Sequence, residues 1–368
     1  MNNSPLLLIG IGGAGSAMAR GINRASGEGL RYILCDTDAQ TGLAGEPFIL
    51  LGGNRLSGHG AGGDVAMARL AADDSRLSIN ETLEGVRLAV IVTALGGGTG
   101  GGSTLAVTKQ LRERGIPTIV FATLPFAFEG EERQRNAIGI TTSIAEEASA
   151  SLFIPLDKLI EEEDVMAEAL RRAVDTLASG VTLFWRLIAK PGYIKLDTER
   201  VRHIISQAGR GRFAVVTAQG PNRATDAVDA LSRAPTLTAD ASPVHSILCG
   251  ILAGDDLRLS EVGKVAEGVR ATFGERSTFD LATVNDESTF SGRLSVVVML
   301  FEASGTALSD EPAAGSSATG KRQRRTAKNP LQQGPQGRGR FNNVEPTIWR
   351  NEDLDTPTFM RRRISLDI

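Results

Sequence analysis

The 368-residue sequence has few of the side chains that build disulfide frameworks or metal centres, with only two cysteines and three histidines. Cys35 and Cys249 each lie within an apolar, strand-like run, which favours small buried side chains over a disulfide or metal ligation. His59, His203 and His245 are far apart in the sequence and have unlike neighbours. The pattern therefore predicts no metal site built from side chains.

Long apolar runs and a strong charge of one sign are also missing. No run approaches the roughly 20 apolar residues of a membrane span, and the N-terminus has no basic region before an apolar core. We therefore expect a cytoplasmic protein with no direct membrane span. The 40 basic and 43 acidic residues give a net charge of −3, which argues against nucleic acid as a partner. Length and a hydrophobic content of 41% permit two domains with their own cores.

The first 150 residues alternate apolar strand-like runs with helical stretches. This alternation is typical of an α/β fold with a doubly wound parallel sheet. The expected strands are Leu6–Ile9, Tyr32–Cys35, Phe48–Leu51, Leu88–Thr93, Thr118–Ala122 and Ser151–Ile154.

Three glycine-rich loops follow expected strands, at the sheet edge where ligands of such folds collect. They are Gly10–Gly15, Ser57–Asp64 and Ala94–Ser103. Glycines let the backbone approach an anion and turn several N–H groups toward it, and a helix beginning near Thr99 would add its positive end. No lysine follows the glycines, so the third loop is not a Walker A motif. Three such loops on one edge predict a polyphosphate ligand.

Two other interpretations of the third loop are weaker. A flexible linker does not explain the strand before it or the helical pattern after it. A dinucleotide-dependent oxidoreductase could use Asp36 for the ribose, but it leaves residues 94–103 without a role.

The second half of the chain differs in character. A helix is expected over Asp164–Ala189, where apolar residues recur every three or four positions until Pro191 and Gly192. Strands and helices then alternate to about Glu302, and a polar, basic segment follows that cannot bury enough surface to order itself. The predicted organisation is a nucleotide-binding domain over 1–165, a connecting helix over 166–190, an α+β domain over 191–302, a disordered linker over 303–345 and a partner-binding peptide over 346–368.

Several motifs resemble the tubulin and FtsZ superfamily, most closely its bacterial FtsZ branch. The run Gly96–Gly102 is similar to the signature GGGTGTG, with Gly101 at its second threonine. Further matches are Gly10–Gly15, Asp36–Gln40, Gly58–Gly63, Pro125–Gly130 with Arg133, Pro191–Asp197 and Leu354–Arg362, all in the family's order. The resemblance covers most of the chain.

The resemblance implies a GTPase that polymerises head to tail into the Z-ring of dividing cells, at mid-cell. GTP and GDP would be the ligands, with Mg²⁺ bound mainly by their phosphates. The next subunit would cover the nucleotide and supply catalytic groups. Nucleotide-binding residues implied by the family are Gly12, Gly13, Gly15, Ala61, Gly62, Gly97, Gly98, Thr99, Gly100, Glu129 and Arg133. Residues 346–368 would bind membrane-adaptor division proteins.

The covering loop departs from the family at one catalytic position. Its NLDxxD pattern is Lys195-Leu-Asp197-Thr-Glu-Arg200 here, so Asp197 is retained and Arg200 replaces the second acid. Arg200 could contact a phosphate across the interface, as an arginine finger does, or pair with Glu199 or solvent. The first case keeps a catalytic role for Arg200. Loss of hydrolysis would instead give a GTP-binding companion or scaffold protein.

Base recognition is altered as well. Ala17, Leu170 and Val174 stand where FtsZ has its guanine-contacting side chains. Asp175 could accept the guanine N–H groups if the helix register moves by one residue. Guanine specificity therefore follows from the resemblance alone.

Overall fold

The computed structural model describes residues 5–26, 30–159, 165–190, 192–206, 208–238 and 243–303, together with two residue pairs near the C-terminus. The chain forms two units, Met1–Asp310 and Glu311–Ile368. In the second unit, β11 (Ile348–Trp349) pairs antiparallel with β12 (Glu352–Asp353). The rest of the predicted linker and C-terminal peptide lies outside the described residues, except for Ala303.

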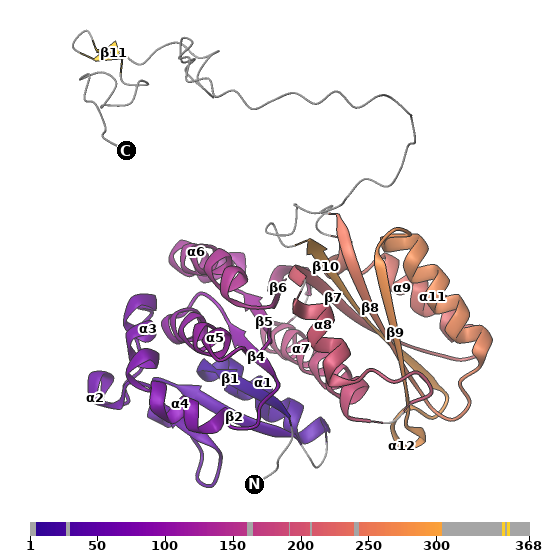
Figure 1. The fold of residues 1–368 in the computed structure, drawn as a ribbon, viewed down its shortest axis with the longest axis horizontal. Helices are drawn as coiled ribbons and strands as arrows, with labels where there is room; N and C mark the ends of the chain where they lie inside the picture. Colours follow the sequence, from indigo (N-terminus) through magenta and orange to yellow (C-terminus); the bar gives the residue numbers. More distant parts are fainter. Residues whose placement is uncertain are drawn as a thin grey trace, which may run out of the picture. The chain divides into compact units, whose positions relative to one another are not determined.

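The N-terminal half is built on six parallel strands (Figure 1). They are β1 (Leu6–Ile11), β2 (Arg31–Asp36), β3 (Phe48–Leu50), β4 (Leu88–Ala94), β5 (Thr118–Leu124) and β6 (Ala150–Pro155). Their order is β3-β2-β1-β4-β5-β6, so the direction of winding reverses between β1 and β4. The predicted doubly wound parallel sheet is confirmed, and its switch point lies between β1 and β4.

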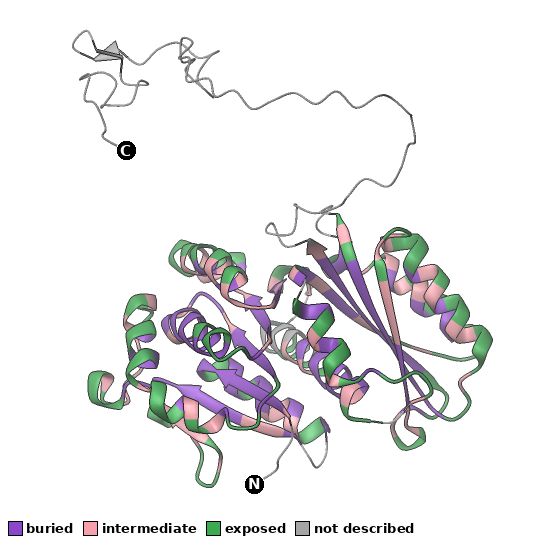
Figure 2. Ribbon diagram, in the orientation of Figure 1, coloured by how far each residue is buried: buried purple, intermediate pink, exposed green. Residues whose placement is uncertain are grey.

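Helices cover both faces of this sheet because its strands are apolar on both sides. Along β1, Leu6 and Leu8 belong to one core cluster, whereas Leu7 and Ile9 belong to another. Figure 2 shows most residues of these strands in purple, as buried, with exposed residues on the outer sides of the helices. The helices are α1 (Gly12–Ser26), α2 (Gly53–Leu56), α3 (Val65–Asp74), α4 (Arg76–Thr82), α5 (Thr104–Glu113) and α6 (Glu131–Glu147).

The predicted long helix is confirmed as α7 (Met166–Ala189), which lies between the two halves in Figure 1. It contacts α1 on one side and β7, β8, β9 and β10 on the other. Phe121 of β5 packs 6.4 Å from Phe184 of α7 and 5.4 Å, edge to face, from Phe213 of β7, measured between ring centroids. One core therefore runs through both halves.

The second half contains four strands and five helices in its described residues, so the predicted alternation of strands and helices is present. They are α8 (Thr198–Ser206), β7 (Ala208–Gln219), α9 (Arg223–Ser232), α10 (Pro235–Thr238), β8 (Val244–Ala253), α11 (Leu259–Phe273), β9 (Thr278–Asn285), α12 (Glu287–Phe290) and β10 (Arg293–Ala303). The strand order continues as β7-β10-β8-β9. Because β7 pairs parallel with β6 at Ser151 and Leu152, the sheet has ten strands and crosses the predicted domain boundary.

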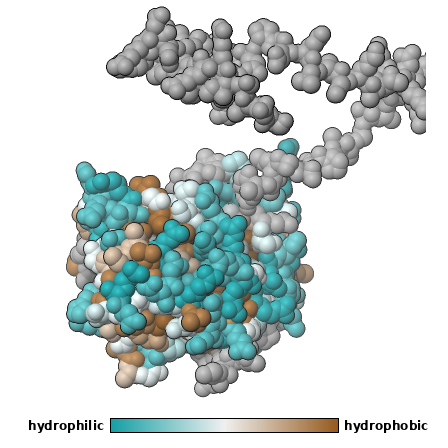
Figure 3. All heavy atoms as spheres, turned by 60° about the vertical axis from the view of Figure 1, so that its left-hand side comes forward, coloured by the Kyte–Doolittle hydropathy of each residue, from teal (hydrophilic) through white to brown (hydrophobic). Residues whose placement is uncertain are grey.

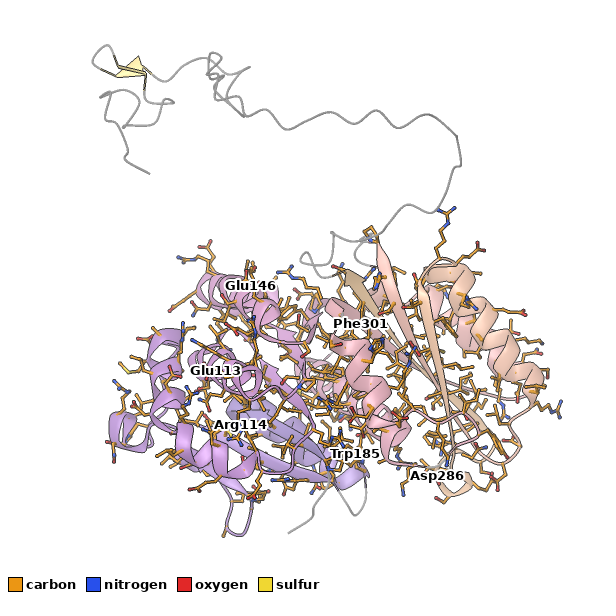
Figure 4. The ribbon with its side chains drawn as sticks, viewed as in Figure 1. Glu113, Arg114, Glu146, Trp185, Asp286 and Phe301 are labelled. Atoms are coloured by element: carbon orange, nitrogen blue, oxygen red, sulfur yellow. The ribbon has the colours of Figure 1, made fainter. Side chains whose placement is uncertain are left out.

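Polar contacts also join the halves. Arg186 of α7 donates to Asp286 at 2.6 Å, to Thr289 at 3.0 Å and to the carbonyl of Ala25 at 3.1 Å. Asp286, labelled in Figure 4, precedes α12, and Ala25 lies near the end of α1. The guanidinium also stacks 5.6 Å from the ring centroid of Phe290. These contacts fix the end of α7 against both halves.

Both cysteines are buried, and the surface has no unusual distribution of apolar residues in the view of Figure 3. Burial raises the pKa of the Cys35 and Cys249 thiols to about 12, so both stay protonated at neutral pH. Apolar residues are scattered among hydrophilic ones on the face shown in Figure 3. No helix within the described ranges is long and apolar enough to cross a membrane.

Candidate functional site

A cleft of about 400 Å³ opens at the carboxyl ends of β1, β4 and β5, beside the switch point of the sheet. It contains eight of the predicted nucleotide-binding residues. The lining residues are Ile11, Gly12, Gly13, Ala14, Met18, Ala94, Leu95, Gly97, Gly98, Thr99, Gly100, Thr123, Pro125, Glu129, Arg133, Leu156 and Val174.

Two helical segments begin at this cleft, so their N-termini face it. Helix α1 begins at Gly12, directly after β1, with Gly12 in the left-handed region at φ +75°. After β4, the chain enters a helical turn at Thr99–Ser103 that continues into α5. The first N–H groups of a helix have no partner within it, and its dipole is positive at that end. The cleft is therefore suited to an anion with several oxygens.

The glycines of the third loop divide into two groups. A Cβ at Gly97 would have no atom within 4 Å, so this position faces open space in the cleft. A Cβ at Gly100 would lie 1.9 Å from the carbonyl oxygen of Ala94, and one at Gly98 would lie 2.8 Å from that of Asp64. Gly98 and Gly100 are thus required for close backbone packing, whereas Gly97 leaves room for a ligand.

The second glycine-rich loop supports the third without reaching the cleft wall. Asp64 caps α3 by accepting the N–H of Met67 at 2.9 Å, and its backbone packs on Gly98. Ala61 and Gly62, predicted to approach the terminal phosphate, are not among the residues that line the cleft.

One hydroxyl beside the cleft was missed by sequence reasoning. The Oγ1 atoms of Thr37 and Thr99 are 2.6 Å apart, which ties the end of β2 to the glycine-rich loop. Its sequence signal is a threonine directly after a strand-ending aspartate. Asp36 itself accepts the backbone N–H of Thr37 at 2.7 Å and the hydroxyl of Thr41 at 2.7 Å. Asp36 therefore holds its own turn and does not line the cleft, contrary to what a dinucleotide enzyme would need.

Glu129 and Arg133 lie together at the cleft wall and pair with each other. The Glu129 carboxylate accepts the backbone N–H of Phe126 at 2.9 Å and the Nη1 of Arg133 at 2.5 Å. Arg133 keeps 60% of its side chain exposed, compared with 22% for Glu129. The guanidinium therefore retains donors for a ligand while its carboxylate partner fixes its position.

The far wall of the cleft is apolar, with Met18, Leu156 and Val174 among its residues. Asp175 points elsewhere: it lines a separate hollow of about 710 Å³ between α1, α7 and the strands of the second half. Val174 and not Asp175 lines the cleft in this structure, and a contact between Asp175 and a base stays a prediction. Ala17 is exposed outside the cleft, and the side chain of Leu170 lies outside the described residues.

Gly15 is buried beneath the cleft and does not line it. A Cβ there would lie 2.5 Å from the carbonyl oxygen of Val92, so glycine allows α1 to pack closely on β4. Its contribution to ligand binding is consequently indirect.

Asp197 and Arg200 lie at the start of α8, away from the cleft. The Asp197 carboxylate caps this helix by accepting the backbone N–H of Arg200 at 2.7 Å. The Arg200 guanidinium donates to Asp280 of β9, with Nε at 2.7 Å and Nη2 at 2.5 Å from Oδ1. The alternative pairing of Arg200 with Glu199 is not formed, because Glu199 pairs with Arg87 and Arg202.

The ion pair between Glu199 and Arg87 shows at which edge of the sheet this loop lies. Arg87 directly precedes β4, whereas the glycine-rich loop of the cleft directly follows it. The loop bearing Asp197 and Arg200 is thus at the amino-end edge of the strands, and the cleft is at the carboxyl-end edge. Seven residues of β4 separate them, about 20 Å at roughly 3.3 Å per residue. Asp197 and Arg200 cannot contact a ligand held in the cleft of their own chain.

The residues present fit a nucleoside polyphosphate. Backbone N–H groups and one arginine suit phosphate oxygens, Glu129 suits ribose hydroxyls, and the apolar wall suits a flat base. Among the described residues, no cluster of three or more His, Cys, Asp or Glu side chains forms a metal site.

Comparison with known proteins gives consistent results. The sequence profile of the Tubulin/FtsZ family, GTPase domain, matches residues 5–164. Cell division protein FtsZ of Pseudomonas aeruginosa is 33% identical over 285 residues, covering 76% of this chain and 72% of that protein. The corresponding protein of Coxiella burnetii is 31% identical over 304 residues, covering 81% and 78%.

Solved structures show the same fold. An FtsZ dimer of M. jannaschii superposes with a TM-score of 0.76 at 25% identity, covering 84% of this chain and 95% of that one. CetZ2 of Haloferax volcanii, solved as a protofilament, has a TM-score of 0.69 at 24% identity, covering 82% and 93%.

Proposed function

Because the chain belongs to the tubulin/FtsZ family of GTPases, we propose that it binds and hydrolyses GTP and polymerises head to tail into filaments for cell division. The cleft beside β1, β4 and β5 holds the nucleotide. Mg²⁺ would be held mainly by the phosphates and would neutralise part of their charge.

The observation that carries this proposal is the separation of the cleft from the loop that bears Asp197 and Arg200. The two lie at opposite edges of the sheet, so they come together only when a second copy stacks its loop edge on the cleft edge. A head-to-tail contact of this kind uses two different surfaces and does not close on itself, so it generates a filament. The M. jannaschii FtsZ dimer, a structural relative, supports self-association.

The chemistry follows from this arrangement. Gly12, Gly13 and Gly97 to Gly100 hold the phosphates through backbone N–H groups, and Arg133 pairs with a phosphate oxygen. Asp197 of the next subunit orients a water toward the γ-phosphorus. The water oxygen forms a bond to phosphorus, the bond from phosphorus to the β–γ bridging oxygen breaks, and GDP and inorganic phosphate result. The carboxylate or solvent takes the water proton. Since phosphoryl transfer depends mainly on positioning and charge stabilisation, assembly itself completes the site.

The regions have separate roles in this proposal. Residues 1–165 bind nucleotide, helix 166–190 connects the halves and 191–302 supply the covering loop. Residues 303–345 link these regions to the peptide 346–368, which binds membrane-adaptor proteins in the cytoplasm at mid-cell.

Assembly should depend on the γ-phosphate. The purified full-length protein with GTP and Mg²⁺ should form filaments that pellet on ultracentrifugation, whereas protein with GDP should stay in the supernatant. The reason is that the γ-phosphate orders the loops at one face of the interface. Equal sedimentation with both nucleotides would refute the proposed function. Filaments without phosphate release would favour the scaffold alternative.

Removing residues 346–368 should separate assembly from localisation. GTP-dependent sedimentation should be unchanged, because the cleft and the covering loop are intact. Fluorescent fusions of the truncated chain should lose their mid-cell position in cells that lack the full-length protein. Mid-cell rings formed by the truncated chain alone would contradict the anchoring role.

A further inference from the structure

Arg200 is held by one edge of its guanidinium. Both Nε and Nη2 converge on a single oxygen of Asp280, at 2.7 and 2.5 Å. The Nη1 group makes no hydrogen bond to any described residue. A guanidinium carries five N–H donors in a planar fork, so the Nη1–Nη2 edge can still receive a second anion. Half of the Arg200 side chain is exposed, compared with 13% of Asp280.

Hydrogen bonds also join the segments on which Arg200 and Asp280 lie. Residues Ile194 and Thr283 exchange hydrogen bonds, from the N–H of Ile194 to Oγ1 of Thr283 and from the N–H of Thr283 to the carbonyl of Ile194, both at 2.9 Å. Thr283 and Asp280 lie on the same strand, β9. The covering loop, the start of α8 and β9 therefore form one fixed unit, and the orientation of Arg200 is set within it.

We propose that Asp280 is a positioning residue, which holds Arg200 with its free edge toward a phosphate oxygen of the nucleotide in the next subunit. This inference rests on the proposed head-to-tail function. The loop that bears Arg200 lies at the opposite edge of the sheet from the cleft of its own chain, with the length of β4, about 20 Å, between the two edges, so the anion comes from another copy. Phosphate is favoured because its oxygens match the planar fork of arginine. Asp280 touches no nucleotide and acts only through Arg200.

Asp280→Asn tests the assignment, since it keeps the shape and removes the charge. GTP turnover should fall roughly threefold and the critical concentration for assembly should rise, because Arg200 loses its orientation. Arg200→Gln should lower turnover about tenfold, and the double variant should match Arg200→Gln alone. The affinity of the monomer for GTP, measured at protein concentrations below those that support assembly, should not change, since the cleft lies at the opposite edge of the sheet.

Two controls accompany these variants. Asp280→Glu should restore most of the activity. Arg202→Gln on the same helix is the matched control, with turnover expected within about twofold of wild type.

Arg200→Lys separates positioning from a purely structural ion pair. It keeps a cation that can pair with Asp280 but lacks the planar fork that would contact a phosphate, so it should be nearly as defective as Arg200→Gln. Activity equal to or above that of wild type would overturn the proposal, as would single-variant effects that simply multiply. An inert wild-type protein would instead refute the proposed function. An active wild type with a neutral Asp280→Asn variant would refute only the role of Asp280.

Discussion

Replacing Gly97 with aspartate should abolish nucleotide binding while leaving the fold intact. A Cβ at this position has no atom within 4 Å and projects into the cleft, so the side chain fits without a backbone clash. Its carboxylate then faces the phosphates, where each pair of unit charges 4 Å apart costs about 1 to 4 kcal/mol at effective dielectric constants of 80 to 20. We expect GTP affinity to fall about 100-fold or more, as measured by titration and by the nucleotide retained during purification.

Gly97→Asn is the matched control, because it has the same shape without the charge. The difference between the two variants isolates the electrostatic effect of a phosphate neighbour. Gly98→Asp is a poorer test, since a Cβ there would lie 2.8 Å from the carbonyl oxygen of Asp64 and would disturb the backbone. Equal GTP affinity in Gly97→Asp and Gly97→Asn would show that phosphates do not bind at this loop.

Asp197→Asn should stop hydrolysis without affecting the binding of GTP. Asparagine is also a good helix cap, so α8 should keep its start, but the neutral amide cannot orient or deprotonate water as a carboxylate does. We expect steady-state phosphate release to fall about 100-fold, within the range measured for single catalytic groups. Glu199→Gln, two residues along the same helix, is the control and should stay near wild type. Wild-type turnover by Asp197→Asn would remove this residue from the mechanism.

Mixing the two inactive variants tests whether the site is shared between subunits. Gly97→Asp lacks a working cleft but keeps Asp197, and Asp197→Asn has the reverse defect. In an equimolar mixture, a Gly97→Asp subunit can cover the nucleotide of an Asp197→Asn subunit, so phosphate release should recover part of the wild-type rate. No recovery, with co-sedimentation of both variants verified, would contradict catalysis across the interface.

Most of the fold could be predicted because it is encoded locally. Apolar runs of six or seven residues become buried parallel strands, and the apolar spacing before Lys190 produces α7 at its predicted end. The candidate site was predictable for a similar reason, since its glycines follow strands whose carboxyl ends must meet at one edge. Gly97, Thr99 and Glu129 line one cleft for this reason.

Contacts between distant segments could not be predicted in this way. The joining of β6 to β7 makes one continuous sheet, although the composition predicts two domains. The packing of α7 determines that Val174 lines the cleft and Asp175 does not. Neighbouring residues on a helix point about 100° apart, and the sequence alone does not fix which of them faces the cleft.

The sequence by itself determined the strands, the long helix, the glycine-rich loops and the replacement of an acid by Arg200. Only the tertiary structure decided that Arg200 pairs with Asp280, eighty residues away, and that Glu199 reaches back to Arg87. The physical reason is that an ion pair depends on where two side chains lie in space, and the packing of β9 and α8 brings these charges together. The charges of two residues and their separation along the chain do not determine the distance between their side chains in space.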